Sequence, residues 1–131
     1  MPGFHLEHYE VVGLTFSKNP QPDVKVNIMT SISYNVRYAS AEQRFIGDAV
    51  VLIQDPEHKD FFNLELHSVG FFTYDFPELT TELKRIIHVE SAKVLLPHWN
   101  SSLACVLQVL DVPPIMLQPL GIDPKDVLIK D

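Results

Sequence analysis

The chain has 131 residues, of which 46% are hydrophobic and 21% charged, so it suits one folded domain better than a disordered segment. Its formal net charge of -7 repels phosphate backbones and anionic lipid, which argues against nucleic acid and membrane surfaces as partners. Cys105 is the single cysteine, which excludes an intramolecular disulfide, and the chain does not open with a signal-peptide pattern. These properties predict a cytoplasmic protein with one domain over residues 1–131.

The first half of the chain has the alternating pattern of β-strands. Apolar residues from Val11 to Phe16 suggest a first strand, which Asn19 and Pro20 end. Residues 24–38 then place apolar side chains at almost every even position and polar side chains between them. This period of two predicts a long strand with two distinct faces.

Two further strands are predicted at residues 45–54 and 61–74. The continuous apolar run 49–53 indicates that both faces of the earlier strand are covered. The later strand changes phase, because even positions are apolar at its start and odd positions, such as Val69, are apolar further on. A change of phase predicts a β-bulge, which we place near residues 68–70.

The second half has the spacing of helices. Asp75 is a candidate N-cap, and the apolar residues that follow recur at helical spacing throughout residues 77–110. Ser91 is a candidate cap for a second segment, and Pro97 predicts a kink or an offset inside the helical region. Residues 111–131 are expected to be irregular.

Strands followed by helices predict the α+β class. We expect a four-stranded antiparallel sheet over residues 5–74, a long helix with a kink or an offset at Pro97 that packs on one face, and an irregular C-terminal segment. A sheet of this size leaves its second face uncovered, although several strands are apolar on both sides. That second face is therefore expected to meet another subunit of a symmetric oligomer.

Residues with catalytic or metal-binding spacing do not stand out. The five glycines are scattered and form no phosphate-binding loop, so we expect no nucleotide, no metal and no other cofactor. Glu65 and His67 share a strand face and form a candidate acid–base pair, although such neighbours are more often a surface couple. Cys105 lies on the apolar helical stretch and is expected to be buried and inert.

Three separated regions carry a recognisable combination: residues 21–28 (QPDVKVNI), residues 62–72 (FNLELHSVGFF), and LLP at 95–97 followed by VPPIMLQPLGID at 112–123. In this order they resemble segments of the SecB family of export chaperones, Q-P-E-V-K-L-x-L, F-L-x-E-V-x-Q-x-G-I-F, L-F-P and F-P-x-L-N-L-x-P-V-N-F-D. The family's order of four strands and then a helix is also the order that periodicity predicts here.

The resemblance implies an ATP-independent chaperone that assembles as a dimer of dimers and binds extended segments of non-native polypeptide in long apolar grooves. Hydrophobic grooves and strand edges bind unfolded chain with little sequence demand, and the negative charge favours basic clients. The candidate residues for the groove or an interface are Phe62, Leu64, Phe71, Phe72, Trp99, Ile115, Leu117, Leu120 and Ile122.

The resemblance is incomplete where the family docks the translocation motor SecA. Glu65 matches one acid of that docking patch, but Gly13 and Ser17 stand at the positions of two other acids. Asn100 and Ser101 stand where the family has Arg-Glu after its L-F-P-Y-A. We therefore expect weak or no binding of SecA, and the fold and the holding activity carry over better than the export role.

Three functions are compatible with the sequence. The first is a SecB-like holding chaperone, which serves either the export pathway or one dedicated client such as an antitoxin. The second is an oligomeric adaptor of the same fold, whose groove is filled by its own tail, residues 115–128. The third, ranked last, is a small enzyme that uses Glu65 and His67.

Overall fold

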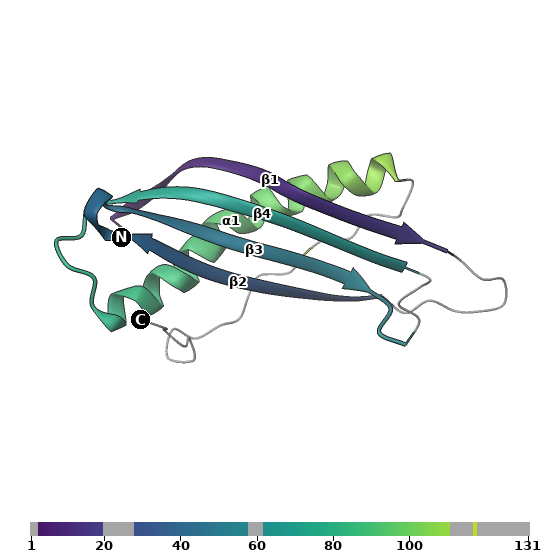
Figure 1. Ribbon diagram of the computed structural model, residues 1–131, viewed down its shortest axis with the longest axis horizontal. Helices are drawn as coiled ribbons and strands as arrows, with labels where there is room; N and C mark the ends of the chain where they lie inside the picture. Colours follow the sequence, from purple (N-terminus) through teal and green to yellow (C-terminus); the bar gives the residue numbers. More distant parts are fainter. Residues whose placement is uncertain (1–2, 20–27, 58–61, 111–116, 118–131) are drawn as a thin grey trace.

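The computed structural model describes residues 3–19, 28–57, 62–110 and 117. Its strands are β1 (Phe4–Lys18), β2 (Met29–Ala39), β3 (Arg44–Gln54) and β4 (Phe62–Tyr74); a 3-10 turn, η1 (Ser40–Glu42), joins β2 to β3, and the helix α1 (Thr81–Val109) follows β4. The strands form one antiparallel sheet in the order β1-β4-β3-β2, and α1 crosses one face of it diagonally (Figure 1). This arrangement confirms the predicted α+β class.

Strand β4 keeps one alternation along its whole length, so the bulge predicted at residues 68–70 is wrong. All its even-numbered residues are buried on the face that α1 covers, and its register with β3 has no irregularity. The bulges lie in β1, which has one more residue than β4 at Glu7 and again at Val12. Val69 and Phe71 suggested a change of phase because they are apolar residues on the uncovered face.

Two paired glycines allow α1 to lie close to the middle of the sheet. Gly47 of β3 and Gly70 of β4 are register partners, and both would press a Cβ atom against Leu95 of α1. A Cβ on Gly70 would lie 2.7 Å from Leu95 Cδ2, and one on Gly47 would meet the hydroxyl of Tyr34. The missing side chains therefore create the space that Leu95 fills.

The core lies between α1 and the covered face of the sheet. Phe45 and Phe72 stack on neighbouring strands, with ring centroids 4.6 Å apart and planes only 9° apart, and Phe4 packs edge-on against both rings. Trp99 of α1 is completely buried and belongs to the same cluster. Apolar residues from all four strands and from α1 thus form one continuous core.

Helix α1 begins later than predicted. Its N-cap is Thr80, whose Oγ1 accepts a hydrogen bond from the backbone N–H of Leu83 at 3.1 Å. Asp75 is not the cap, because its backbone N–H donates to the carbonyl of Gly3 at 2.9 Å and thereby extends the pairing between the ends of β1 and β4. A contact so distant in sequence cannot be read from local capping preferences.

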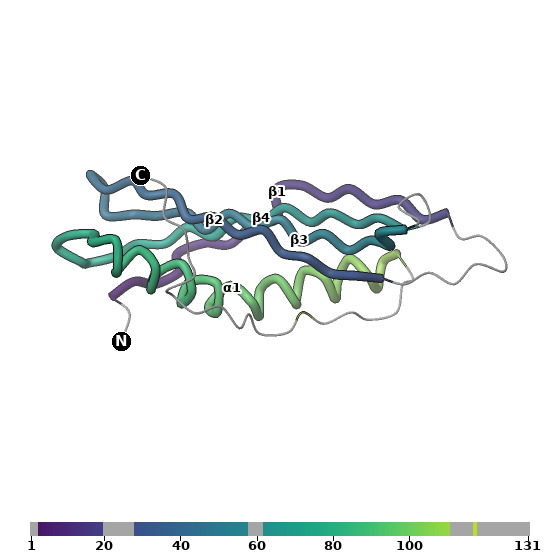
Figure 2. The backbone as a smooth tube through the Cα atoms, turned by 90° about the horizontal axis from the view of Figure 1, so that it is seen from below, coloured from purple at the N-terminus to yellow at the C-terminus, as the bar shows by residue number. Residues whose placement is uncertain are grey.

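The predicted second helical segment is also wrong, because Ser91 lies inside a continuous α1. Pro97 lies inside the same helix, and Figure 2 shows α1 as one uninterrupted helix. Cys105 is exposed on α1 and not buried as expected. Among the described residues, no helix combines the length and the apolar character that crossing a membrane requires.

Candidate functional site

One residue of the C-terminal segment is held against α1. Leu117 is only 4% exposed and belongs to the hydrophobic core cluster. Its backbone N–H donates to Asn100 Oδ1 at 2.7 Å, and Asn100 Nδ2 donates to its carbonyl oxygen at 3.2 Å. Figure 2 shows the short coloured piece of the trace at residue 117 beside α1. We name this arrangement, the Asn100 amide together with the apolar surroundings of the Leu117 side chain, the Leu117 seat.

The chemistry of the Leu117 seat follows from the planar amide of Asn100. That amide presents one acceptor and one donor side by side, which match the N–H and C=O of a single residue in extended conformation. Leu96 and Leu103 lie one turn from Asn100 on the same side of α1, and Leu103 is fully buried. The seat therefore recognises a backbone through hydrogen bonds and an aliphatic side chain through burial.

The structure brings together five of the nine residues that were predicted to line a groove or an interface. The five share one buried cluster between sheet and helix: Phe62, Leu64, Phe72, Trp99 and Leu117. Phe71 lies on the opposite face of the sheet, and the remaining three, Ile115, Leu120 and Ile122, lie outside the described residues. The sequence marked Asn100 only as a departure from a family motif, and its partner could not be identified from spacing.

A hydrogen-bonded pair joins the edge strand β2 to α1 next to Trp99. Ser91 Oγ donates to the backbone carbonyl of His88 at 3.3 Å, so the 2.6 Å bond between Ser91 and Tyr34 is donated by the Tyr34 hydroxyl. The Tyr34 ring meets Trp99 and His88 edge-on, at centroid distances of 5.6 and 5.0 Å. Burial raises the pKa of Tyr34 and lowers the pKa of His88, so both side chains are neutral at pH 7.

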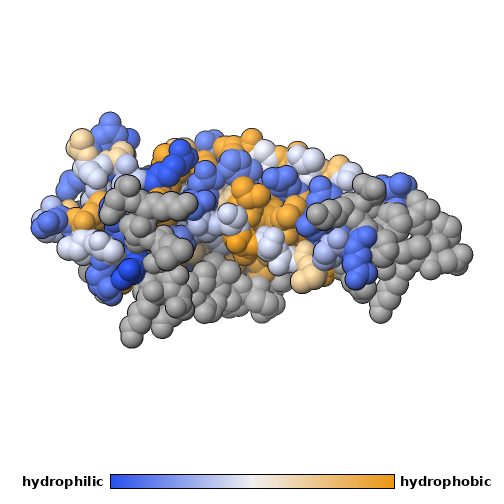
Figure 3. Space-filling view, turned by 60° about the horizontal axis from the view of Figure 1, so that its bottom comes forward, coloured by the Kyte–Doolittle hydropathy of each residue, from blue (hydrophilic) through white to orange (hydrophobic). Residues whose placement is uncertain are grey.

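Exposed apolar side chains gather on the two edge strands. Val11, Val12 and Leu14 of β1 are 44%, 51% and 49% exposed. Ile28, just before β2, is 42% exposed, and Met29, the first residue of β2, is 62% exposed. Figure 3 shows an apolar patch near the middle of the side along which β2 forms the sheet edge. Edge strands also present backbone N–H and C=O groups without a neighbouring strand, so both edges can accept further polypeptide.

A cavity of about 700 Å³ opens where η1 turns the chain beside the end of β4. Its lining combines aromatic rings with two acidic and two basic residues: Glu7, Arg37, Tyr38, Ala39, Glu42, Arg44, Phe45, Ile46, Phe71, Phe72 and Thr73. Thr73 Oγ1 donates to Glu7 Oε1 at 2.9 Å across one side. The balanced charges and aromatic walls suit an apolar group better than an anion.

The uncovered face carries the predicted acid–base pair, but His67 does not contact Glu65. His67 Nε2 lies 2.5 Å from Asp48 Oδ1, and Asp48 Oδ2 lies 3.5 Å from Arg37 Nη2. Glu65 is exposed on the same face of the same strand. Within the described residues, no group of three or more His, Cys, Asp or Glu side chains is placed to hold a metal ion.

The three positions of the family's acidic docking patch lie together on this uncovered face. The register pairs Gly13 with His67 and Ser17 with Asn63. Both positions therefore lie two residues along β1 from the residue that pairs with Glu65. Glu65 is the one acidic residue among the three. At the three positions that the resemblance indicates, this face therefore offers one carboxylate, that of Glu65.

The fold is that of a known chaperone structure. The chain superposes on the SecB-like chaperone Rv1957 of Mycobacterium tuberculosis, solved in complex with a ChAD peptide from the antitoxin HigA1, with a TM-score of 0.69. The two sequences are 13% identical, and the match covers 90% of this chain and 88% of the other. No family model and no curated protein matches the sequence. The resemblance in the motifs is thus confirmed as a shared SecB-like fold.

Proposed function

We propose, from the SecB-like fold of this chain, that it is an ATP-independent chaperone that holds extended segments of non-native polypeptide. The observation that carries this proposal is the shared fold, which spans nearly the whole of both chains and belongs to a protein solved with a bound peptide. A fold alone does not specify an activity, so the apolar surfaces of this chain must supply the second argument.

Those surfaces have the properties that holding requires. The edge strands expose apolar side chains such as Val12 and Met29, and on their outer sides no further strand of the described residues pairs with their backbone groups. The Leu117 seat binds one residue through its backbone and its aliphatic side chain. An unfolded client offers such residues, and a folded protein does not. Binding and release can then follow equilibrium alone, without nucleotide.

Self-assembly belongs to the same proposal. Val11, Val12 and Leu14 leave a long apolar edge on β1, which a monomer would expose to water. Pairing between copies would cover part of it, and we infer a dimer of dimers located in the cytoplasm. The formal net charge of -7 favours clients with a basic character.

A dedicated client of the antitoxin type is favoured over export through SecA. Gly13 and Ser17 leave Glu65 as the single acid of the three docking positions, and the matched chaperone was solved with an antitoxin peptide. We expect weak or no binding of SecA, reduced further by Glu65→Ala, in a titration with purified SecA. A tight complex that Glu65→Ala leaves unchanged would refute this account of the patch.

The second candidate is an oligomeric adaptor that has the fold but no general client binding. The buried Leu117 favours it, because this residue of the chain itself already occupies apolar surface that a client would need. The adaptor and the chaperone differ in one readout, the fate of an aggregating client. A small enzyme that uses Glu65 and His67 is disfavoured, because His67 contacts Asp48 and not Glu65.

An aggregation assay tests the proposal directly. The purified protein, at stoichiometric amounts and without nucleotide, should slow the aggregation of a chemically denatured or reduced client, while native mass measurement gives the assembly. Failure to slow aggregation by a protein that is folded and oligomeric contradicts the chaperone proposal and supports the adaptor. A monomer mass contradicts the dimer of dimers.

A further inference from the structure

We infer that the Leu117 seat is a client-binding subsite occupied in this structure by the chain's own Leu117, and that it selects an extended residue with a free backbone N–H and an aliphatic side chain. The inference rests on the proposed function, because it needs a polypeptide client. It goes beyond that function by assigning the selecting residue, Asn100, and the occupant that a client must displace.

The hydrogen bonds of the seat distinguish backbone from side chain. Asn100 contacts the N–H and the C=O of Leu117, at 2.7 and 3.2 Å, and neither bond depends on which side chain residue 117 carries. A proline has no N–H and would leave Asn100 Oδ1 without that donor. The seat therefore accepts many residues, provided that the chain is extended and the residue is not proline.

The side-chain requirement comes from burial. Leu117 is 4% exposed and lies in the same cluster as Trp99 and Leu103, both fully buried. A charged or polar side chain would lose its hydration there without gaining a partner. Leucine, isoleucine, valine and methionine fit this requirement, and they are the residues that a non-native polypeptide exposes and a folded one hides.

The sequence around Leu117 agrees with this selection. Prolines stand at positions 113, 114 and 119, and none stands at position 117 itself. Proline disfavours helix in the residues before it, and it cannot donate at its own position. The pattern leaves an N–H donor at the one position where Asn100 accepts it. The tail is thus an internal ligand with the chemistry that the seat requires.

Occupation by the tail lowers the apparent affinity for a client. A tethered segment competes at a high effective concentration, so an untethered client binds only during the fraction of time in which the seat is open. Weakening the tail should therefore strengthen client binding. A substitution that removes the Asn100 amide should abolish this gain in client affinity, because Asn100 contacts the tail and the client alike. Return of the tail also gives a route to client release without nucleotide.

The test uses the full-length protein and a fluorescently labelled synthetic peptide with the sequence of residues 112–123 (VPPIMLQPLGID) as the probe. Fluorescence anisotropy should show that Leu117→Ala protein binds the probe at least tenfold more tightly than the parent, a change of about 1.4 kcal/mol. Leu117→Val should give a smaller gain in the same direction. A probe N-methylated at the leucine that corresponds to Leu117 lacks the N–H donor and should lose the gain.

Substitutions at Asn100 complete the test. Adding Asn100→Ala to Leu117→Ala should return the affinity to the parental value or below. Asn100→Asp keeps an acceptor but loses the donor. Its affinity for the probe should lie between that of the protein with Asn100 and that of Asn100→Ala. Val109→Ala is the matched control, since Val109 is 84% exposed at the end of α1 and should leave the affinity unchanged.

Equal affinity of the probe for Leu117→Ala protein and the parent, or for the N-methylated and the plain probe, overturns the inference. The aggregation assay separates this failure from a failure of the proposed function. If probe binding depends on Asn100 but the protein does not suppress aggregation, the inference about the seat stands and the proposed chaperone function is refuted. If the protein suppresses aggregation but probe binding does not depend on Asn100, the inference about the seat is refuted and the proposed chaperone function stands.

Discussion

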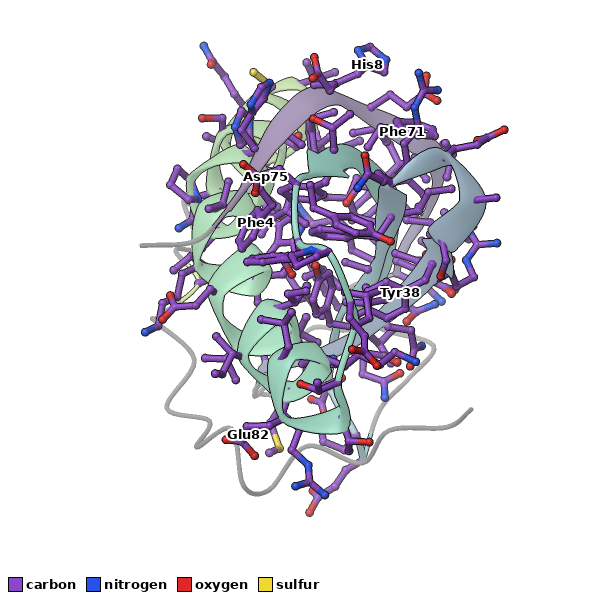
Figure 4. The ribbon with its side chains drawn as sticks, turned by 90° about the vertical axis from the view of Figure 1, so that its left-hand side faces the viewer. Phe4, His8, Tyr38, Phe71, Asp75 and Glu82 are labelled. Carbon is purple, nitrogen blue, oxygen red and sulfur yellow. The ribbon has the colours of Figure 1, made fainter. Side chains whose placement is uncertain are left out.

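The two faces of the sheet are made from the same strands, yet they meet different surroundings. Phe72 faces α1 and is 1% exposed, whereas its neighbour Phe71 is half-buried on the uncovered face and stacks on His8 at a centroid distance of 5.8 Å. Figure 4 shows His8 and Phe71 together on the side away from α1. Dense packing makes the covered face specify the fold, whereas the uncovered face can change its charges without unfolding the chain.

The largest expected difference between the faces comes from this neighbouring pair of phenylalanines. Phe72→Ala should lower the free energy of unfolding by about 3–5 kcal/mol, because it empties a fully packed site under α1. Phe71→Ala should cost about 1 kcal/mol or less, because water already reaches its ring. Urea denaturation of both variants gives the comparison. Equal losses would show that the uncovered face is as tightly packed as the covered one.

A smaller effect is expected from adding a methyl group to a glycine on each face. Gly70→Ala should destabilise by about 1–3 kcal/mol, because the new Cβ would lie 2.7 Å from Leu95 Cδ2. Gly13→Ala should be neutral or slightly stabilising, because on the uncovered face its Cβ would lie 3.6 Å from His67 Cβ. Thermal melts of the two variants measure the difference. A destabilised Gly13→Ala would contradict the open packing that we describe.

A third comparison concerns two tyrosine hydroxyls of β2 on the covered face. Tyr34→Phe should cost about 1 kcal/mol, because it removes the bond to Ser91. Tyr38→Phe should cost nothing or stabilise, because the buried Tyr38 hydroxyl has no hydrogen-bond partner in the part of the chain that the structure describes. Chemical denaturation measures the free energy of unfolding of both variants. A larger loss for Tyr38→Phe than for Tyr34→Phe would contradict the hydrogen bond assigned between Tyr34 and Ser91.

The smallest expected effect is a pH dependence that originates at His88. Burial lowers the pKa of His88 below its ordinary value of 6.5, so the unfolded chain binds a proton more readily than the folded chain. The stability from neutral His88 is complete above pH 6.5 and is lost as the pH falls below that value. His88→Gln should flatten this part of the pH profile in urea denaturation. If the free energy of unfolding of His88→Gln changes with pH as steeply as that of the parent, the pH dependence belongs to other groups.

The covered face could be predicted from sequence because its information is local. Alternation along residues 28–38 and the helical spacing within residues 81–109 are set by which side chains are buried. Errors arose where a distant contact overrides a local signal. Asp75 looks like a cap but pairs with Gly3, and Ser91 looks like a cap but bonds across to Tyr34.

The candidate site was predicted less well than the fold. Trp99 and Leu117 were selected as apolar residues near the resemblance motifs, and the structure places both in one cluster. The sequence groups Phe71 with them although it lies on the other face, because an apolar residue at an odd position of β4 mimics a change of phase. Asn100 was missed as a binding residue, since only the fold brings its amide to the backbone of Leu117 across 17 residues.

Hydrogen exchange at the backbone N–H of Leu117 tests the central claim most directly. In the free protein this N–H is bonded to Asn100 and should exchange slowly. When a chemically denatured client is added at stoichiometric amounts without nucleotide, Leu117 should lose its protection as the client is held. Protection that persists while the client stays in solution would contradict the claim that client and tail compete for one seat.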